Sequence, residues 1–213
     1  MIISEEVAKH DIISLIDVVL RDAEIRGENE MFISKDNTAG EILYKTHKVG
    51  KEIISYDINA ALENQKSISY YPGTNFWKFT EQLLTKDSSP IVPCINLESQ
   101  EEGPIFKVVG SGAFKKGKLV GYLDHLETRS VLLTKDEMKG GFIVVESEVD
   151  GQKYKSTLEI FGSKTKVKPE YKDNKLTMNI DIEIETGIIE LDGEKDFIEE
   201  KGREILQKDA ENN

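Results

Sequence analysis

Apolar residues spaced three and four apart predict a helix over about residues 4–22, with Ser4 as its N-cap. One side of this helix is expected to be buried, formed by Val7, Ile12, Leu15, Ile16 and Val19. Its second half is apolar nearly all round, which predicts packing on more than one side. A short buried strand is expected next, at residues 31–33.

Residues 38–86 carry mostly helical signals. One helix is predicted over residues 52–64, and the Tyr-Tyr-Pro-Gly sequence at 70–73 predicts a turn. Thr74 or Asn75 can cap the next helix, whose apolar positions include Phe76 and Phe79. This part of the chain is therefore helix-rich.

Later in the chain, the spacing of apolar residues changes from three and four, which is typical of helices, to every second residue, which is typical of strands. A strand is predicted over residues 91–97, where Pro93 is compatible only with an edge or a bulge. A hairpin follows, with strands at 105–114 and 119–123 joined by a tight Lys-Lys-Gly-Lys turn.

Beyond this hairpin we expect a helix over about residues 124–133 with Asp124 as its cap, then strands at 142–145, 154–161 and 176–185. In the last strand, apolar residues alternate strictly with polar ones, which predicts an antiparallel strand with one face in solvent. A final helix is expected over about residues 194–207.

The grouping of strands and helices predicts an α+β protein, because the two do not alternate strictly. A helix-rich half and a strand-rich half meet near residue 103. The 213 residues are enough for one large domain or two small ones.

The net charge of the chain limits the kinds of molecule that it is expected to bind. Asp and Glu number 40 against 28 Lys and Arg, which gives a net charge of −12. Such a chain is unsuited to nucleic acid and gains little from an anionic membrane surface. Its single cysteine, Cys94, cannot form an internal disulfide, and no apolar run approaches the roughly 20 residues of a membrane-spanning helix.

One segment imitates a phosphate-binding loop. Residues 112–118 have its glycines and lysine, but Leu119 stands where a hydroxyl ligand for magnesium belongs. A strand, not a helix, is predicted to follow, so we interpret the segment as a hairpin turn.

The remaining reactive side chains show no converging pattern. His10, His47 and His125 lie in separate predicted elements without a second ligand at helical spacing, so we expect no metal site. Cys94 lies in an apolar strand and is interpreted as a small buried side chain. No catalytic residues, cofactor or metal are expected, and a hydrolase is suggested only by the abundance of carboxylates.

Although the chain as a whole is acidic, it contains two local groups of lysines. They are Lys115, Lys116 and Lys118, and then Lys164, Lys166, Lys168, Lys172 and Lys175. If their hairpins adjoin, they form a basic edge toward anionic lipid or an acidic partner. Lysines that protect a sheet edge from aggregation are the interpretation we favour.

In order along the chain, several segments resemble the C subunits of spore germinant receptors, the GerAC-like or Ger(x)C lipoprotein family. These segments are SEEVAKHDIISLIDVVLRDAEIR, LLTKDSSPIVPCINLE, GSGAFKKGKLVGYLDHLETRSVLL, KGGFIVVE and LEIFGSKTKVKPEY. The resemblance implies a non-enzymatic subunit on the outer face of the spore inner membrane, which assembles with the membrane-embedded A and B subunits to sense nutrients.

In family terms, residues 1–38 complete a first domain, 39–103 form a small helix-rich middle domain, and 104–213 form a third domain. The third domain is expected to contain a curved antiparallel sheet with helices and to be incomplete at its C-terminal end. The family's signal peptide and lipid-modified cysteine are missing from this chain, so we interpret it as a fragment or a shortened chain that would reach a membrane only through such an anchor.

Family-like residues are densest in the 117–129 region, so we expect Gly121, Tyr122, Glu127 and Arg129 to contact partner subunits. The alternative is a germinant-binding module, in which an aromatic group lines an apolar pocket. That group consists of Tyr70, Tyr71, Phe76, Trp77 and Phe79.

Overall fold

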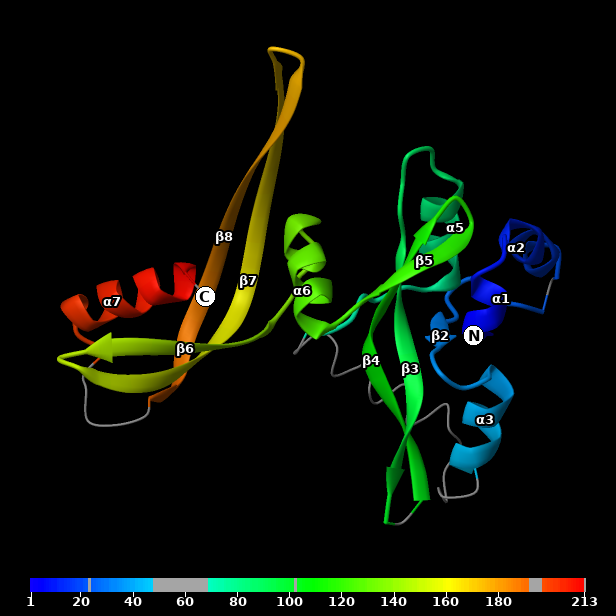
Figure 1. Ribbon diagram of the computed structural model, residues 1–213, viewed down its shortest axis with the longest axis horizontal. Helices are drawn as coiled ribbons and strands as arrows, with labels where there is room; N and C mark the ends of the chain where they lie inside the picture. The colour runs from blue at the N-terminus through cyan, green and yellow to red at the C-terminus, as the bar shows by residue number, and fades with distance from the viewer. Residues whose placement is uncertain (23, 48–68, 102, 192–196, 213) are drawn as a thin grey trace. The chain divides into compact units, whose positions relative to one another are not determined.

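The computed structural model describes residues 1–22, 24–47, 69–101, 103–191 and 197–212 (Figure 1). The chain divides into two compact units. Unit 1 comprises Met1–Gln65 and Tyr70–Val131, and unit 2 comprises Lys66–Ser69 and Leu132–Asn213. The α+β class is confirmed, with helices concentrated in the first half and antiparallel strands in the second.

Unit 1 is built on a mixed sheet in the order β1-β2-β3-β4-β5. Its strands are β1 (Ile2–Ser4), β2 (Phe32–Ser34), β3 (Ile91–Gln100), β4 (Gly103–Lys115) and β5 (Lys118–Leu123). The first three are parallel, and the last two continue antiparallel as hairpins. β2 is buried along its whole length, as the Met31–Ile33 pattern predicts.

Among the described residues, the helices of unit 1 are α1 (Glu5–Ala8), α2 (Ile13–Leu20), α3 (Ala39–His47) and α5 (Phe76–Leu84), and α6 (His125–Thr134) begins in unit 1 and ends in unit 2. Side chains from α1, α2 and α5 form one core with the sheet, including Ile16, Phe79 and Phe114. Ile42 of α3 belongs to a second core cluster, with Phe32 and Ile95 of the sheet. The sheet of unit 1 therefore has two buried clusters of apolar side chains.

The prediction of one continuous helix over residues 4–22 is wrong. The helix stops after Ala8 and restarts at Ile13, where the Asp11 carboxylate accepts a hydrogen bond from the Ile13 N–H. The Ile12 N–H donates to the carbonyl of Gly117 in the β4–β5 turn, so a contact distant in sequence replaces an intrahelical bond. α2 is also not packed all round, because Val18 is 66% exposed.

Local signals place several other elements correctly. The Asn75 side chain caps α5 by accepting from the Lys78 N–H, and Pro93 lies where the β3–β4 register shifts at a bulge. The predicted boundary at residue 103 lies between β3 and β4, which pair in the same sheet of unit 1. The predicted helix over 52–64 lies outside the described residues.

Unit 2 contains an antiparallel sheet in the order β6-β7-β8 and the helix α7 (Glu200–Glu211). The strands are β6 (Gly141–Val149), β7 (Gln152–Lys172) and β8 (Lys175–Leu191). α7 lies against β6, and Leu206 packs in a cluster with Val145, Leu158 and Phe197. Among the described residues, this last helix starts at Glu200, later than the predicted start at residue 194.

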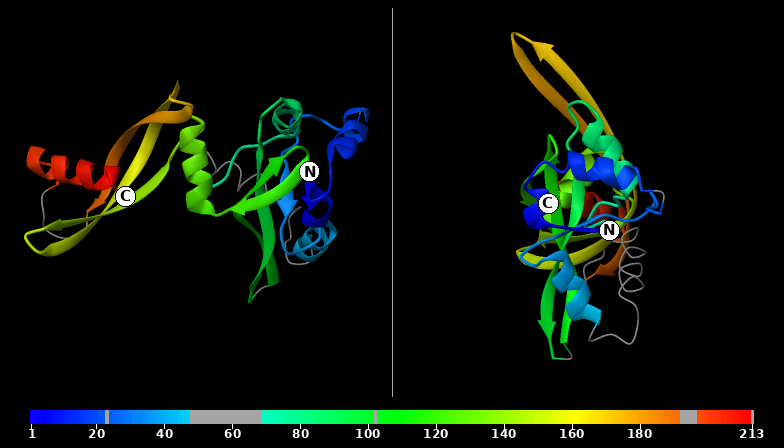
Figure 2. Two further views of the ribbon diagram at one scale, coloured as in Figure 1. Left: turned by 45° about the horizontal axis from the view of Figure 1, so that its top comes forward. Right: turned by 90° about the vertical axis from the view of Figure 1, so that its right-hand side faces the viewer.

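The distal parts of β7 and β8 form a two-stranded ribbon that runs away from α7 and β6 in every view (Figures 1 and 2). We define this ribbon as residues 162–185. The expectation that one of its faces is buried is wrong, because Met178, Ile180 and Ile182 are 50%, 45% and 43% exposed. Alternation predicted the strand correctly but could not show whether anything covers it.

None of the helices that the structure describes combines the length and apolar character needed to cross a bilayer.

Candidate functional site

The four residues singled out by the sequence lie on β5 and on α6, which starts two residues after that strand. Gly121 and Tyr122 are half-buried on β5, and a Cβ atom added at Gly121 would meet nothing within 4 Å. On α6, Glu127 is exposed and Arg129 is half-buried. β5 is the last strand of its sheet, so this segment lies at an edge of unit 1.

Glu127 has a clear structural role. Its carboxylate accepts a hydrogen bond from the Asp124 N–H at 2.9 Å, and its own N–H donates to the Asp124 carboxylate at 2.8 Å. This reciprocal pair is a capping box that satisfies two backbone donors at the start of α6. The predicted cap at Asp124 is therefore confirmed, and Glu127 contributes to the same cap.

Tyr122 lies in a cluster of charged groups drawn from three separate elements. The Lys35 ammonium stands 4.6 Å from the centre of its ring, a cation–π geometry. The Glu5 carboxylate at the start of α1 forms a salt bridge with Lys9 and accepts from the Asp36 N–H at 3.2 Å. The buried Tyr122 hydroxyl lies beside the Glu5 carboxylate, although among the described residues no contact of this hydroxyl has ordinary hydrogen-bond geometry.

The electrostatics of this cluster follow from burial and neighbouring charge. Burial raises the pKa of Tyr122, and the nearby Glu5 carboxylate raises it further. The hydrogen bond from Lys9 lowers the pKa of Glu5. Cys94 lies in the same core, where burial raises the pKa of its thiol to about 12. The Cys94 thiol therefore stays protonated at neutral pH and is a poor nucleophile, as the sequence predicted.

Arg129 lies in a different environment. Burial lowers the pKa of its guanidinium, and Tyr70 opposes that shift. The Tyr70 ring packs against the ring of His125 with their centres 5.6 Å apart. Tyr122 and Arg129 therefore have different neighbours: Tyr122 lies near Glu5 and Lys35, and Arg129 lies near Tyr70. The four predicted residues do not converge on one point.

The aromatic group proposed as a ligand pocket is dispersed. Tyr71, Phe76 and Phe79 are buried core residues. Trp77 is 57% exposed and lies over Gly27, whose lack of a side chain makes room for the indole ring.

The histidines remain separate in the structure. His10 is exposed, His125 packs on Tyr70, and the side chain of His47 lies outside the described parts. Across the residues that the structure describes, no group of three or more His, Cys, Asp or Glu side chains is arranged to hold a metal ion.

The segment that imitates a phosphate-binding loop is a hairpin turn, as predicted. Lys115 at the end of β4 pairs with Lys118 at the start of β5, and both Lys116 and Gly117 have positive φ angles, 50° and 79°. Two consecutive positive φ values are typical of the tight turns that join antiparallel strands. No helix follows the turn, because the chain continues as β5.

The two lysine groups belong to different units. Lys115, Lys116 and Lys118 lie at the β4–β5 turn, whereas the second group lies on the ribbon. In the ribbon, Lys164 is opposite Glu183 and Lys166 is opposite Asp181. Lys164 and Lys166 therefore face carboxylates across the strand pair, an arrangement the sequence did not predict, whereas Lys168 is opposite Asn179 and Lys172 is opposite Lys175.

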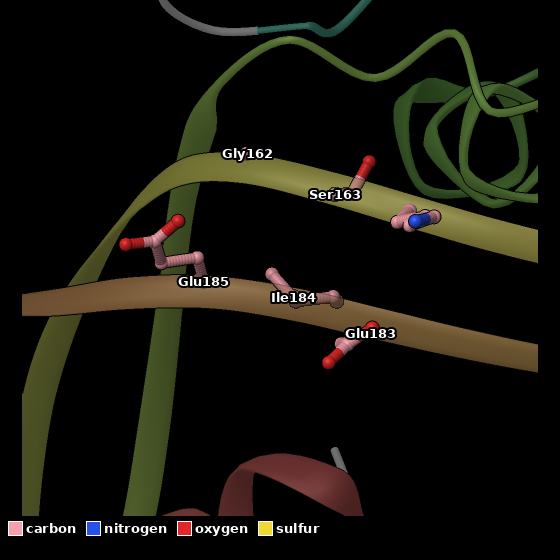
Figure 3. Close-up of a pocket in the computed structure, with 6 residues that line it drawn as sticks. Gly162, Ser163, Glu183, Ile184 and Glu185 are labelled. Atoms are coloured by element: carbon pink, nitrogen blue, oxygen red, sulfur yellow. The ribbon is translucent and has the colours of Figure 1, made fainter.

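A shallow hollow of about 510 Å³ lies at the base of the ribbon (Figure 3). It lies next to the bulge at which the β7–β8 register shifts between Ile160 and Gly162. Figure 3 shows it lined by backbone and by side chains that spread outward, not by groups that converge on a centre. Its lining residues are Gly162, Ser163, Lys164, Glu183, Ile184 and Glu185.

Comparison with known proteins identifies the family. Residues 1–97 match a family described as "Spore germination protein N-terminal domain". Residues 109–213 match a family described as "Spore germination B3/ GerAC like, C-terminal". Both halves of the chain are therefore accounted for, in the family's order.

A curated relative and a solved structure agree with this result. The "Spore germination protein GerQC" of Bacillus cereus is 24% identical over 209 residues, which are 98% of this chain and 56% of that protein. The fold matches the crystal structure of the GerBC protein with a TM-score of 0.66 and 19% identity, over 100% of this chain and 61% of that one. The chain thus spans less than two thirds of each relative, and it belongs to the GerAC-like, or Ger(x)C, family of spore germination proteins.

Proposed function

We propose that this chain is a non-enzymatic subunit of a nutrient germinant receptor and that it assembles with the membrane-embedded A and B subunits. The observation that carries the proposal is the pair of family matches over residues 1–97 and 109–213. In this proposal the complex acts at the outer face of the spore inner membrane, and the chain contributes surfaces for docking. Its division into domains at residues 38 and 103 belongs to the same proposal.

The β5–α6 segment is the proposed contact with a partner subunit. It lies at the edge of the unit 1 sheet and presents the half-buried Tyr122 and Arg129. The Tyr122 hydroxyl is buried beside the Glu5 carboxylate, so the ring, not the hydroxyl, is the part of this half-buried residue that a partner can reach.

Gly121 offers the sharpest test of the contact. Its backbone φ is not in the left-handed region and the space around its Cα is open, so Gly121→Gln is expected to fold normally and to obstruct a partner. Co-purification with the A and B subunits should fall. Gly40→Gln in α3 is the matched control, since that position is also open.

Charge reversal at Arg129 gives a second arm of the test, with Arg203→Glu on the exposed part of α7 as its control. If Gly121→Gln and Arg129→Glu both fold and both retain normal association, the proposed contact is wrong.

Germinant binding by this chain is the alternative. Trp77 is the only tryptophan and is exposed, so its fluorescence reports binding nearby. Saturable quenching by one nutrient would favour that alternative over a docking role alone.

A further inference from the structure

One helix of the chain is shared by the two compact units. α6 covers His125–Thr134, and the division between the units falls inside it, after Val131. Residues 125–131 therefore belong to unit 1, and residues 132–134 belong to unit 2. Formation of this one helix thus involves residues of both units.

α6 is too short to be stable by itself. It has 10 residues, whereas isolated helices shorter than about 12–15 residues are marginal in water even with favourable sequences. Thr128, Ser130 and Val131 are weaker helix formers than alanine or leucine. The Ser130 hydroxyl also donates to the Leu126 carbonyl at 2.9 Å, a type of bond that slightly destabilises helices. α6 therefore depends on the groups that bind its two ends.

The N-terminal end of α6 is bound by groups of unit 1. The capping box of Asp124 and Glu127 satisfies two backbone donors there. The Thr128 hydroxyl donates to the Ser111 hydroxyl of β4 at 3.1 Å, and both residues are fully buried. Breaking a buried hydrogen bond of this kind leaves polar groups unsatisfied, so it stabilises the attachment of α6 to the unit 1 sheet.

The C-terminal end of α6 is bound by groups of unit 2. The last carbonyls of a helix have no partner within the helix itself. The Leu132 carbonyl accepts from the Glu137 N–H at 2.8 Å. The Leu133 carbonyl accepts from the Thr165 hydroxyl of β7 at 2.6 Å. The Thr165 N–H donates to the Asp136 carboxylate at 2.8 Å, so the turn after the helix is bonded to the same strand.

We propose that α6 couples the two units, so that an interaction which stabilises its unit 1 half also stabilises residues 132–137 and their bonds to β7. The two states involved are α6 formed from end to end and α6 locally unfolded. The groups at both ends favour the formed state. Because each end acts on the same equilibrium, the coupling is reciprocal, and effects are expected in both directions along the helix.

The use of this coupling in a receptor rests on the proposed function. The proposed partner contact includes Arg129, which lies in the unit 1 half of α6. A partner that binds there only when the helix is formed would favour the formed state. The bond between Leu133 and Thr165 would then open less often. Docking on unit 1 would thereby change the stability of a segment of unit 2.

The test uses the whole chain alone and follows amide hydrogen exchange by NMR. Asp124→Ala removes the side-chain cap of α6, and Asn75→Ala removes the matched cap of α5, a helix that lies wholly in unit 1. Asp124→Ala should speed exchange at the Glu137 and Thr165 amides of unit 2 by about two- to fivefold, because loss of a cap shifts a helix toward its open state by about that factor. Asn75→Ala should leave both amides unchanged.

A second pair of variants tests the opposite direction. Thr165→Val removes the hydroxyl that is bonded to the Leu133 carbonyl. Thr157→Val on the same strand is its control, since the Thr157 hydroxyl contacts β8 instead of α6. Thr165→Val should speed exchange at the Thr128 amide in the unit 1 half of α6 by about two- to fivefold, and Thr157→Val should not.

Two results would overturn the inference. One is unchanged exchange at Glu137 and Thr165 in Asp124→Ala, whether or not exchange at Glu127 rises. The other is equal acceleration by a control variant, since the amides would then report global unfolding instead of opening of α6. The receptor subunits take no part in these measurements, so a failure here is distinguishable from a failure of the proposed partner contact.

Discussion

Replacing Tyr122 by phenylalanine separates the needs of folding from those of docking. The change removes a buried hydroxyl without a normal hydrogen-bond partner among the described residues and keeps the ring beneath Lys35. A buried polar group left unsatisfied costs about 1–3 kcal/mol, and Tyr122 is only half-buried, so the lower end applies. We therefore expect Tyr122→Phe to raise the free energy of unfolding by about 1 kcal/mol at neutral pH.

The same substitution has a defined effect at alkaline pH. Burial and the Glu5 carboxylate raise the pKa of Tyr122 in the folded state above its ordinary value of 10.0. A raised pKa means that the folded state holds its proton longer than the unfolded state does. The resulting stabilisation is complete below pH 10.0 and is lost as the pH rises from there through the folded pKa. Tyr122→Phe removes this contribution, so its stability should fall less steeply in that range.

Urea unfolding at neutral pH and at several values above pH 10.0 measures both effects. Tyr171→Phe is the matched control, since Tyr171 is 69% exposed and should change stability by less than about 0.5 kcal/mol at neutral pH. If Tyr122→Phe instead destabilises the protein by more than about 1 kcal/mol, the hydroxyl has an internal partner and the reasoning fails. A more stable variant that binds the receptor subunits less well would assign the hydroxyl to docking.

Two further substitutions test the structure of unit 1. Phe79→Ala empties a fully buried site whose ring packs edge-on against Phe114 at 5.1 Å, and urea unfolding should show a loss of about 3–5 kcal/mol. A loss below about 1 kcal/mol would place Phe79 outside the core. Asp124→Ala breaks the capping box of α6 and should cost about 1 kcal/mol, with faster hydrogen exchange at the Glu127 amide. Unchanged exchange there would show that α6 does not need this cap.

Elements specified by local chemistry could be predicted from the sequence. Asn75 caps α5 because its side chain reaches a backbone donor three residues later, and the β4–β5 turn follows from Lys116 and Gly117. The break between α1 and α2 could not be predicted, because it depends on a bond from Ile12 to Gly117, which is distant in sequence. Helical periodicity is a local signal, and it cannot report a distant contact that replaces one turn.

The candidate site shows the same limit. Tyr122 stood out through the family resemblance, but its neighbours Glu5 and Lys35 come from α1 and the segment after β2. β1 and β5 lie at opposite ends of the strand order, yet α1 contacts β5 directly, and no short motif encodes that contact. The structure adds that the Tyr122 hydroxyl is buried beside the Glu5 carboxylate, which the identity of the residue alone does not reveal.

The ribbon raises a different question, because folding of unit 2 as described does not explain its sequence. The core of that unit lies where α7 meets the sheet, around Val145, Leu158 and Phe197. Ile180 and Ile182 belong to none of its described clusters, so their apolar character adds little to the stability of the isolated unit. The strict alternation on β8 therefore specifies a strand, while the clusters described for this unit leave its apolar face unused.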